Sequence, residues 1–383
     1  MSKKVLFVHD LAFKIEKENK DLYSGSGLYE VYFNRFFDAG FNTVDILSRY
    51  NEYNKNIDTG FMKINNRNIK ILKGFSKNYF YLFNPLNIYK INNLIKQYDL
   101  IVCSTPSIIG TWILIINLFQ KKKYSVEVAG DYDMFSTKKF GFIITYFLKN
   151  LMPKFIKNAN GATYVTNDLS RRFPNNNSLI ASNVNIKKIH YKQVIIKELK
   201  FKENIEIGYI GALTKRKGIS ILIEFANKLV EMNIRNFQIN LIGGHSDDDW
   251  KEKVSELKID KYFVFHGNLD SKNVDLLLKR LDLYIQPSFS EGLPRATIEA
   301  MSNGLPVIAT TLPGFKELLE DDYLFEHQDI NKMLDIFNSL ISSIDNYNLQ
   351  SKRNSNFAKS FLYDVLHEKR KTFYNNLLEK DSI

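Results

Sequence analysis

The chain of 383 residues has one cysteine, two tryptophans and eight prolines. A lone cysteine, Cys103, excludes an intramolecular disulfide and a zinc site built on cysteines, and it fits a reducing compartment. The longest predominantly apolar stretch, residues 108–119, is too short to span a bilayer. The opening Met-Ser-Lys-Lys leads directly into the apolar residues 5–8, so we expect no signal peptide and a cytoplasmic location.

Acidic residues are scarce in the first half of the chain. Residues 1–200 contain 30 Lys and Arg against 15 Asp and Glu, a net +15, whereas residues 201–383 contain 23 against 27, a net −4. Residues 59–98 and 134–167 contain seven and five basic side chains, interleaved with aromatics, and no acid. This asymmetry indicates a polyanionic partner such as an anionic membrane, nucleic acid or a phosphorylated substrate. Compositional drift in a chain rich in Lys, Asn and Ile is the alternative explanation.

Short apolar runs alternate with amphipathic segments along the whole chain, which predicts an α/β protein with parallel sheets covered on both faces. The first series of expected strands is residues 5–8, 69–72, 100–103, 125–129, 162–166 and 179–181. The second series is residues 205–210, 237–242, 262–265, 283–286 and 306–310.

These two series predict two domains. We expect an N-terminal domain over residues 1–190 and a C-terminal domain over residues 200–357, joined by a polar, Lys-rich linker at 183–204. A last helical segment within residues 358–383 has apolar positions at helical spacing. The sequence leaves open which domain it packs on.

The strongest motif lies at residues 288–309, SFSEGLPRATIEAMSNGLPVIA. An expected strand runs into a loop, Pro294 fits the first turn of a helix, and Gly304 follows that helix as its cap. Glu291 and the amides of Gly292 and Leu293 then lie at the carboxyl end of a strand and at a helix N-terminus. Open parallel sheets bind ligands there, and free amides favour phosphate.

This segment resembles the signature of the retaining glycosyltransferases of family 4, with its Glu-x7-Glu pair and a GT-B fold of two Rossmann-like domains facing a cleft. Residues 211–218, GALTKRKG, resemble the family's Gly-Arg-Leu-x-x-x-Lys-Gly, and residues 263–268, FVFHGN, resemble its Val-x-Phe-x-Gly strand end. The resemblance covers residues 205–320 well, and the first 200 residues match in layout alone.

The resemblance implies roles for individual residues. Lys217 would contact the donor diphosphate beside Gly211, and Glu291 the hydroxyls of the transferred sugar. Glu299 would bind the ribose, and His266 would lie beside the nucleotide base. The amides of Gly292 and Leu293 would contact sugar and phosphate.

One position departs from the family pattern. Ala212 stands where the family usually has Arg, and the sequence leaves open whether Lys215 or Arg216 replaces that cation.

Further candidates are less specific. Gly25 and Gly27, in a loop after the first strand, resemble the family's glycine-rich loop near the donor phosphates. Asp131, after the strand at 125–129, is the candidate catalytic residue of the N-terminal half, with a loop-capping role as the alternative. His9 is a weaker candidate, and a structural role fits it better. We interpret residues 247–249, three aspartates, as a helix cap rather than a metal site.

The expected function is transfer of a sugar from a UDP- or GDP-sugar to a glycan or polyprenyl-diphosphate-linked acceptor in surface polysaccharide biosynthesis. We expect no cofactor, no essential metal and no nucleic-acid partner, and peripheral contact with an anionic membrane. A GT-B phosphorylase, a nucleotide-sugar epimerase and an inactive partner subunit are alternatives within this fold. A nucleic-acid-binding protein is the alternative from another class.

Overall fold

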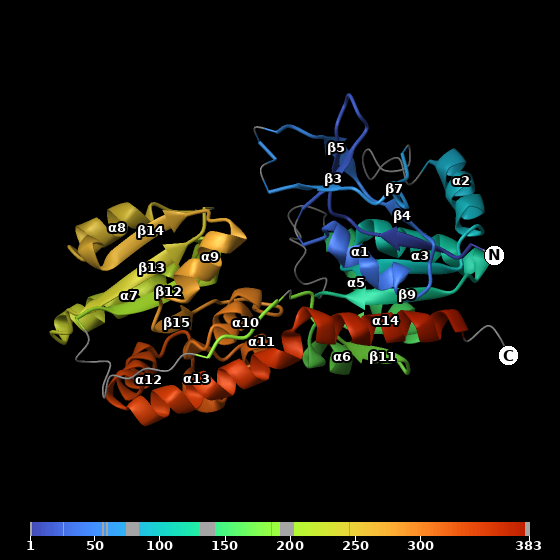
Figure 1. The fold of residues 1–383 in the computed structure, drawn as a ribbon. Coiled ribbons are helices and arrows are strands. Elements are labelled where there is room, and N and C mark those ends of the chain that lie inside the picture. The colour runs from blue at the N-terminus through green and yellow to red at the C-terminus, as the bar shows by residue number, and fades with distance from the viewer. Residues whose placement is uncertain are drawn as a thin grey trace. The chain divides into compact units, whose positions relative to one another are not determined.

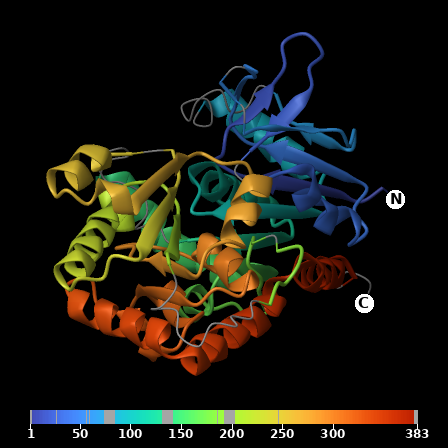
Figure 2. The ribbon, with the colours of Figure 1, turned by 60° about the vertical axis from the view of Figure 1, so that its left-hand side comes forward.

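The computed structural model describes residues 2–379, apart from 26, 56, 59, 74–83, 131–141, 185, 192–202 and 245. The chain forms two compact units, Met1–Asn183 with Leu366–Ile383, and Val184–Val365. Figure 1 traces both units along the chain, and Figure 2 shows them from another side. Each unit is a parallel β-sheet with helices on its two faces, so the predicted fold class is confirmed.

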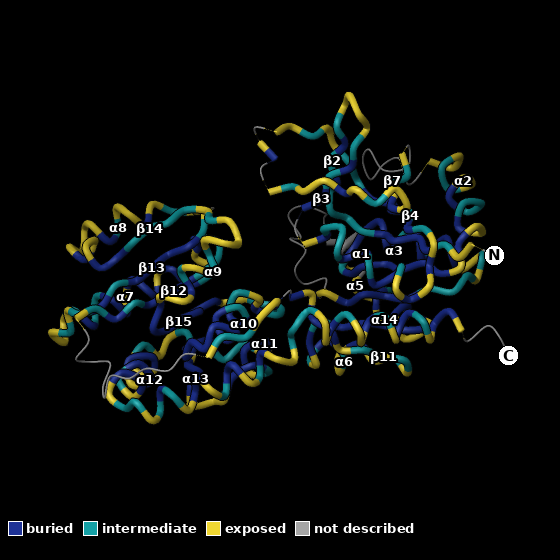
Figure 3. Tube along the Cα trace, viewed as in Figure 1, coloured by how far each residue is buried: buried dark blue, intermediate teal, exposed yellow. Residues whose placement is uncertain are grey.

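A seven-stranded parallel sheet forms the centre of the first unit. Its central strands are buried, as Figure 3 shows, which explains why their sequences are mainly apolar. The strand order changes direction between β1 and β8, because β4 and β7 are added on one side of β1 and the later strands on the other. In spatial order the strands are β11 (Ser178–Ile180), β10 (Gly161–Tyr164), β9 (Tyr124–Val128), β8 (Leu100–Thr105), β1 (Lys4–Val8), β4 (Thr43–Leu47) and β7 (Ile69–Ile71).

Helices cover both faces of this sheet. On one face, α2, α3 and α5 pack over Leu6 and the buried Cys103, which is a core residue as expected. On the other face, α1 and α14 pack over Val5 and Phe7, so the C-terminal helix completes the first unit. The helices are α1 (Glu30–Phe37), α2 (Pro85–Ile95), α3 (Ile108–Gln120), α5 (Phe142–Asn158), α6 (Asn167–Arg172) and α14 (Tyr363–Glu379).

A small four-stranded sheet, absent from the sequence prediction, belongs to the same unit. Its strands are β5 (Tyr50–Glu52), β2 (Phe13–Ile15), β3 (Leu22–Ser24) and β6 (Met62–Ile64), in spatial order. They follow β1 and β4 in the chain and are too short to show a period. The expectation that the glycine loop directly follows the first strand is therefore wrong. Gly25 and Gly27 follow β3 instead.

The second unit contains a six-stranded parallel sheet with the order of a Rossmann fold. Gly304 follows the helix α10 with φ of +72°, as the sequence predicted for its cap. The strands, in spatial order, are β14 (Phe263–Gly267), β13 (Phe237–Ile242), β12 (Ile205–Ile210), β15 (Leu283–Gln286), β16 (Val307–Thr310) and β17 (Leu324–Phe325). The helices are α7 (Ile219–Glu231), α8 (Trp250–Glu256), α9 (Ser271–Leu278), α10 (Arg295–Ser302), α11 (Pro313–Lys316), α12 (Ile330–Ser342) and α13 (Ile344–Ala358).

The division between the units falls at residue 183, earlier than the sequence indicates. Val184 and Ile186 are buried against Ala300 and Leu305, so the beginning of the expected linker is part of the second unit's core. Because the surrounding segment is polar, the sequence did not indicate that these two apolar residues, two positions apart, belong to the core.

Candidate active site

The strand order of the second sheet reverses between β12 and β15, and a cavity of about 510 Å³ lies at the carboxyl ends of these two strands. Ligands of open parallel sheets bind at such a switch point. The predicted residues Gly211, Lys217, Glu291, Leu293 and Glu299 all line this cavity. Residues from two separate motifs, 211–218 and 288–309, thus meet in one place.

Lys217 reaches the cavity from a short 3-10 turn that follows β12. The turn is closed by Gly218 in a left-handed conformation with φ of +77°, and a Cβ there would lie 1.9 Å from the Pro287 carbonyl oxygen. Only glycine permits this approach. The turn therefore packs against the loop after β15, and Lys217 Nζ lies 2.5 Å from Glu291 Oε1.

Glu291 is held by a chain of side chains that alternate along β15 and its extension. Ser288 Oγ donates a hydrogen bond to Glu291 Oε1 (2.8 Å), and Gln286 Nε2 donates to Ser288 Oγ (3.0 Å). Tyr284 OH donates to Gln286 Oε1 (2.5 Å). Burial raises the pKa of Tyr284 well above its usual range, so its hydroxyl remains a donor. The carboxylate is thereby oriented from the sheet.

Glu299 enters the cavity from the second turn of α10. Burial raises the pKa of its carboxyl, and the positive charge of Arg295 one turn earlier partly opposes that effect. Within the described residues, its carboxylate oxygens form no hydrogen bond or ion pair, so they are free to accept hydrogen bonds from a ligand.

His266 has a different position. It lies on β14 outside the lining of this cavity, and its Nε2 donates to Asn240 Oδ1 at 2.8 Å. Asn240 Nδ2 in turn donates to Glu206 Oε2 at 2.7 Å. Burial lowers the pKa of His266, with the Glu206 charge acting in the opposite direction. The ring therefore belongs to a polar cluster within the sheet.

Other predicted residues lie elsewhere. Gly25 and Gly27 are in the first unit, where Gly25 packs against the Phe61 ring. Asp131 lies outside the described residues. Asp249 caps α8 by accepting from the Glu252 amide at 3.0 Å, in agreement with a capping role.

The corresponding switch point of the first unit, between β1 and β8, is occupied by the side chain of Asp10. This residue was not among the predicted site residues. Asp10, two residues after the end of β1, accepts hydrogen bonds from the amides of Ile108 (2.7 Å) and Ile109 (3.0 Å) at the start of α3. It also accepts from Ser107 Oγ at 2.9 Å. An internal carboxylate thus occupies the position that a phosphate would take. The neighbouring His9 has a structural contact, since its Nδ1 accepts from the Leu11 amide at 2.8 Å.

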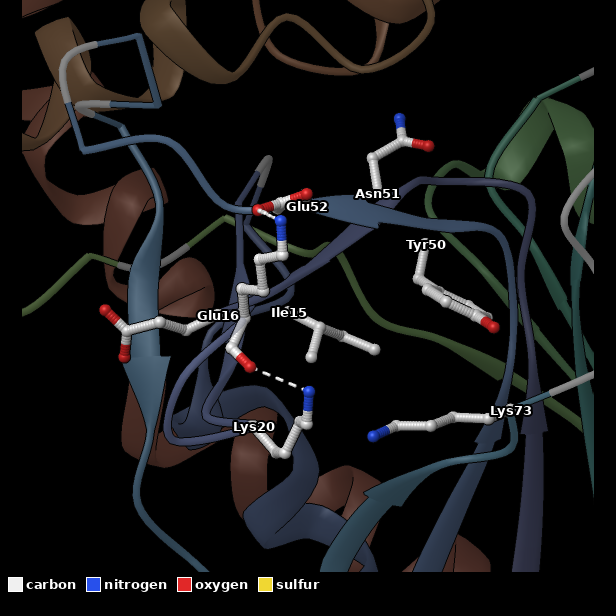
Figure 4. Close-up of a pocket in the computed structure, with 8 residues that line it drawn as sticks. Ile15, Glu16, Lys20, Tyr50, Asn51, Glu52 and Lys73 are labelled. Atoms are coloured by element: carbon white, nitrogen blue, oxygen red, sulfur yellow. Dashed lines mark hydrogen bonds and ion pairs between the residues drawn. The ribbon is translucent and has the colours of Figure 1, made fainter.

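A second cavity, of about 450 Å³, lies on the small sheet of the first unit. Figure 4 shows Ile15 and Tyr50 at its centre, with the ammonium groups of Lys20 and Lys73 beside them. Two glutamates line the same cavity, so an aromatic ring beside charged groups of both signs suits a polar, sugar-containing ligand.

Two α/β units with parallel sheets, one of which carries a cavity at its switch point, have the architecture of the GT-B fold. Residues 192–357 match the family Glycosyl transferases group 1. The chain is 30% identical to Protein CapJ of Staphylococcus aureus over 88% of this chain and 86% of that protein. The chain belongs to the group 1 glycosyl transferases.

Two further proteins are similar to this chain, one over part of its length and the other over nearly all of it. The O-antigen biosynthesis glycosyltransferase WclY of Escherichia coli is 27% identical over 46% of this chain and 48% of that protein. The crystal structure of HepE from Anabaena in complex with UDP and glucose superimposes with a TM-score of 0.64 at 16% identity, covering 99% of each chain. The latter likeness supports the fold.

No helix in the described part of the chain has the length and apolar character that crossing a membrane requires.

Proposed function

We propose that this glycosyltransferase is a retaining enzyme of family 4 that transfers a sugar from a UDP- or GDP-sugar. The acceptor is a glycan or a polyprenyl-diphosphate-linked precursor of a surface polysaccharide. The observation that carries the proposal is the cavity at the β12/β15 switch point, where Lys217, Glu291 and Glu299 converge.

Each of these side chains has a distinct role. Lys217, the amides of Gly292 and Leu293 in the loop before α10, and the amides of the first turn of α10 neutralise the donor diphosphate. Glu291 accepts hydrogen bonds from the sugar through Oε2, since Ser288 and Lys217 are bonded to Oε1. Glu299 accepts from the ribose hydroxyls.

The reaction breaks the bond between the sugar's anomeric carbon and the diphosphate oxygen, which leaves with the electron pair. The acceptor hydroxyl forms the new bond on the same face, and its proton passes to an oxygen of the departing diphosphate. Lys217 and the helix amides stabilise the charge that develops on this leaving group. The transfer thus proceeds without a metal ion, because fixed cationic and dipolar groups take that role.

The first unit supplies the acceptor side. The cavity on the small sheet has an apolar and aromatic centre for a sugar ring, and its lysines and two glutamates offer hydrogen-bonding partners for the polar groups of the acceptor. If the acceptor binds there, Tyr50→Ala raises the acceptor KM about tenfold and leaves the donor KM unchanged. An unchanged acceptor KM would place the acceptor elsewhere, and Tyr191→Ala, which removes an exposed tyrosine of the second unit, is the matched control.

A lipid-linked acceptor also requires contact with a membrane. The helices α2 and α3 expose Leu86, Tyr89, Leu118 and Phe119, the last being 81% exposed, and their sequences contain no acid. We call these residues, together with the exposed Lys90, Lys96 and Lys121, the α2–α3 surface. It docks on the anionic inner face of the plasma membrane.

The donor is identified by thermal unfolding in the presence of nucleoside mono- and diphosphates and their sugars. A ligand of the folded protein raises Tm by mass action. We expect a shift with either UDP or GDP and their sugars, without added metal. Absence of a shift with every nucleotide would refute the donor assignment, and a requirement for inorganic phosphate in turnover would indicate a phosphorylase.

A further inference from the structure

The cavity at the β12/β15 switch point contains a second cation that the sequence motifs did not indicate. Arg295, the first residue of α10, lines it together with Lys217 and Ala212. Its side chain is exposed, and among the described residues no carboxylate lies within ion-pair distance of it. Lys217, by contrast, is paired with Glu291.

The position of Arg295 is unfavourable for an isolated protein. A helix N-terminus has a partial positive charge, so a cation in the first turn is repelled by the helix dipole. The first turn of α10 contains no acid, and no side chain caps its amides. A bound anion would relieve both features at once, because it would accept hydrogen bonds from the free amides and from the guanidinium that lines the same cavity.

The cations closest in sequence to Ala212 are engaged elsewhere. Lys215 Nζ pairs with Asp248 Oδ2 at 3.2 Å, and Arg216 Nη1 donates to the Ser290 carbonyl at 3.1 Å. Neither side chain lines the cavity.

We propose that Arg295 binds the donor diphosphate and replaces the cation that Ala212 lacks. The inference rests on the proposed function and adds a specific binding residue to it. A guanidinium contacts phosphate oxygens through two parallel N–H groups, which an ammonium does not do. Arg295 therefore distinguishes a nucleoside diphosphate from the monophosphate, whereas Glu299 contacts the part that both ligands share.

The test measures the Kd of the nucleoside diphosphate and monophosphate by isothermal titration calorimetry for five proteins. They are the wild type, R295Q, R295K, the double variant A212R/R295Q and the control R280Q. Arg280 is an exposed arginine of the second unit outside the cavity. We expect R295Q to weaken diphosphate binding about 10- to 100-fold, as for a lost charge-assisted hydrogen bond, and to affect the monophosphate less.

The double variant A212R/R295Q, which moves the arginine from position 295 to position 212, is the more decisive test. A212R/R295Q is expected to regain most of the lost affinity, because position 212 borders the same cavity. R295K should retain part of it, and R280Q all of it. Diphosphate binding by R295Q at wild-type affinity would overturn the proposal and leave the proposed function intact. A wild type that binds no nucleoside diphosphate would refute the proposed function, and the proposal with it.

Discussion

When no donor is bound, Lys217 forms an ion pair with Glu291. The donor diphosphate must therefore compete with Glu291 for Lys217. In Lys217→Ala the leaving diphosphate loses a fixed positive charge, so kcat at saturating donor is expected to fall about 100- to 1,000-fold. Lys228→Ala is the control, since Lys228 is an exposed cation of the same unit that pairs with Glu231. Steady-state kinetics with a full donor titration measures the effect. Transfer at the wild-type rate would remove Lys217 from the mechanism.

In the protein without a bound ligand, the buried carboxylate of Glu299 is expected to lower the free energy of unfolding. Because burial raises its folded-state pKa above the unfolded value, the folded state binds the proton more tightly. Its contribution to stability therefore falls as pH rises from the ordinary glutamate pKa through the raised one. Glu299→Gln should raise Tm at pH 7 by about 2 °C and remove this pH dependence, while weakening nucleotide binding.

The matched control is Glu256→Gln, which removes an exposed carboxylate of α8. Thermal unfolding between pH 4 and 8 compares the variants. A Glu299→Gln protein that is less stable than the wild type at pH 7 would show that the carboxylate has a stabilising partner.

The C-terminal helix α14 is attached to the first unit by a buried charged cluster as well as by its apolar face. Glu127 on β9 accepts hydrogen bonds from Tyr374 OH (2.7 Å), from Arg35 Nη1 (3.3 Å) and from Tyr32 OH. Burial raises the pKa of Tyr374 well above its usual range, so it remains a donor. Tyr374→Phe leaves a buried carboxylate with one partner fewer, which should destabilise the first unit by about 1–3 kcal/mol.

The two tryptophans report on the two units separately, because Trp112 is in α3 and Trp250 in α8. In a Trp250→Phe background, Tyr374→Phe should lower the urea midpoint followed by Trp112 fluorescence. In a Trp112→Phe background, the Trp250 midpoint should stay unchanged. Tyr89→Phe, at an exposed position of α2, is the control. An unchanged Trp112 midpoint would contradict a stabilising role for the Glu127 cluster.

Element type was predictable wherever one periodicity dominates. The buried strand β8 begins with a continuous apolar run, and α7 shows a single apolar stripe, so the sequence alone indicates both element types. The small sheet was not predictable, because strands of three residues show no period and their pairing joins segments after β1 and after β4.

The site was predictable where local motifs carry its geometry. Lys217 and Glu291 each precede a glycine, Glu299 lies in the second turn of the helix that follows Pro294, and all three reach one cavity. Asp10 and Arg295 were missed for a different reason. Their importance comes from what the fold brings near them, the start of α3 in one case and an uncapped helix end in the other.

At the scale of the whole molecule, the charge asymmetry distributes over the two units. The first unit has basic, acid-free helices that expose apolar side chains, and the second has the cavity proposed for the donor. A general attraction of a basic protein to anionic lipid would follow net charge alone, whereas docking through the α2–α3 surface depends on where the charges lie. These two explanations can be separated by experiment.

Vesicle sedimentation with anionic lipid compares two triple variants of equal charge. The first variant replaces Lys90, Lys96 and Lys121 by Gln and so removes three cations of the α2–α3 surface. Each lysine near a membrane contributes about 1 kcal/mol, so binding to the vesicles should fall about 100-fold. The second variant replaces Lys251, Lys258 and Lys261 by Gln. It removes exposed cations of the second unit and should have little effect on vesicle binding. Equal losses in the two variants would mean that net charge governs binding. A loss confined to the first variant means that α2 and α3 face the bilayer, since only position distinguishes the two sets of lysines.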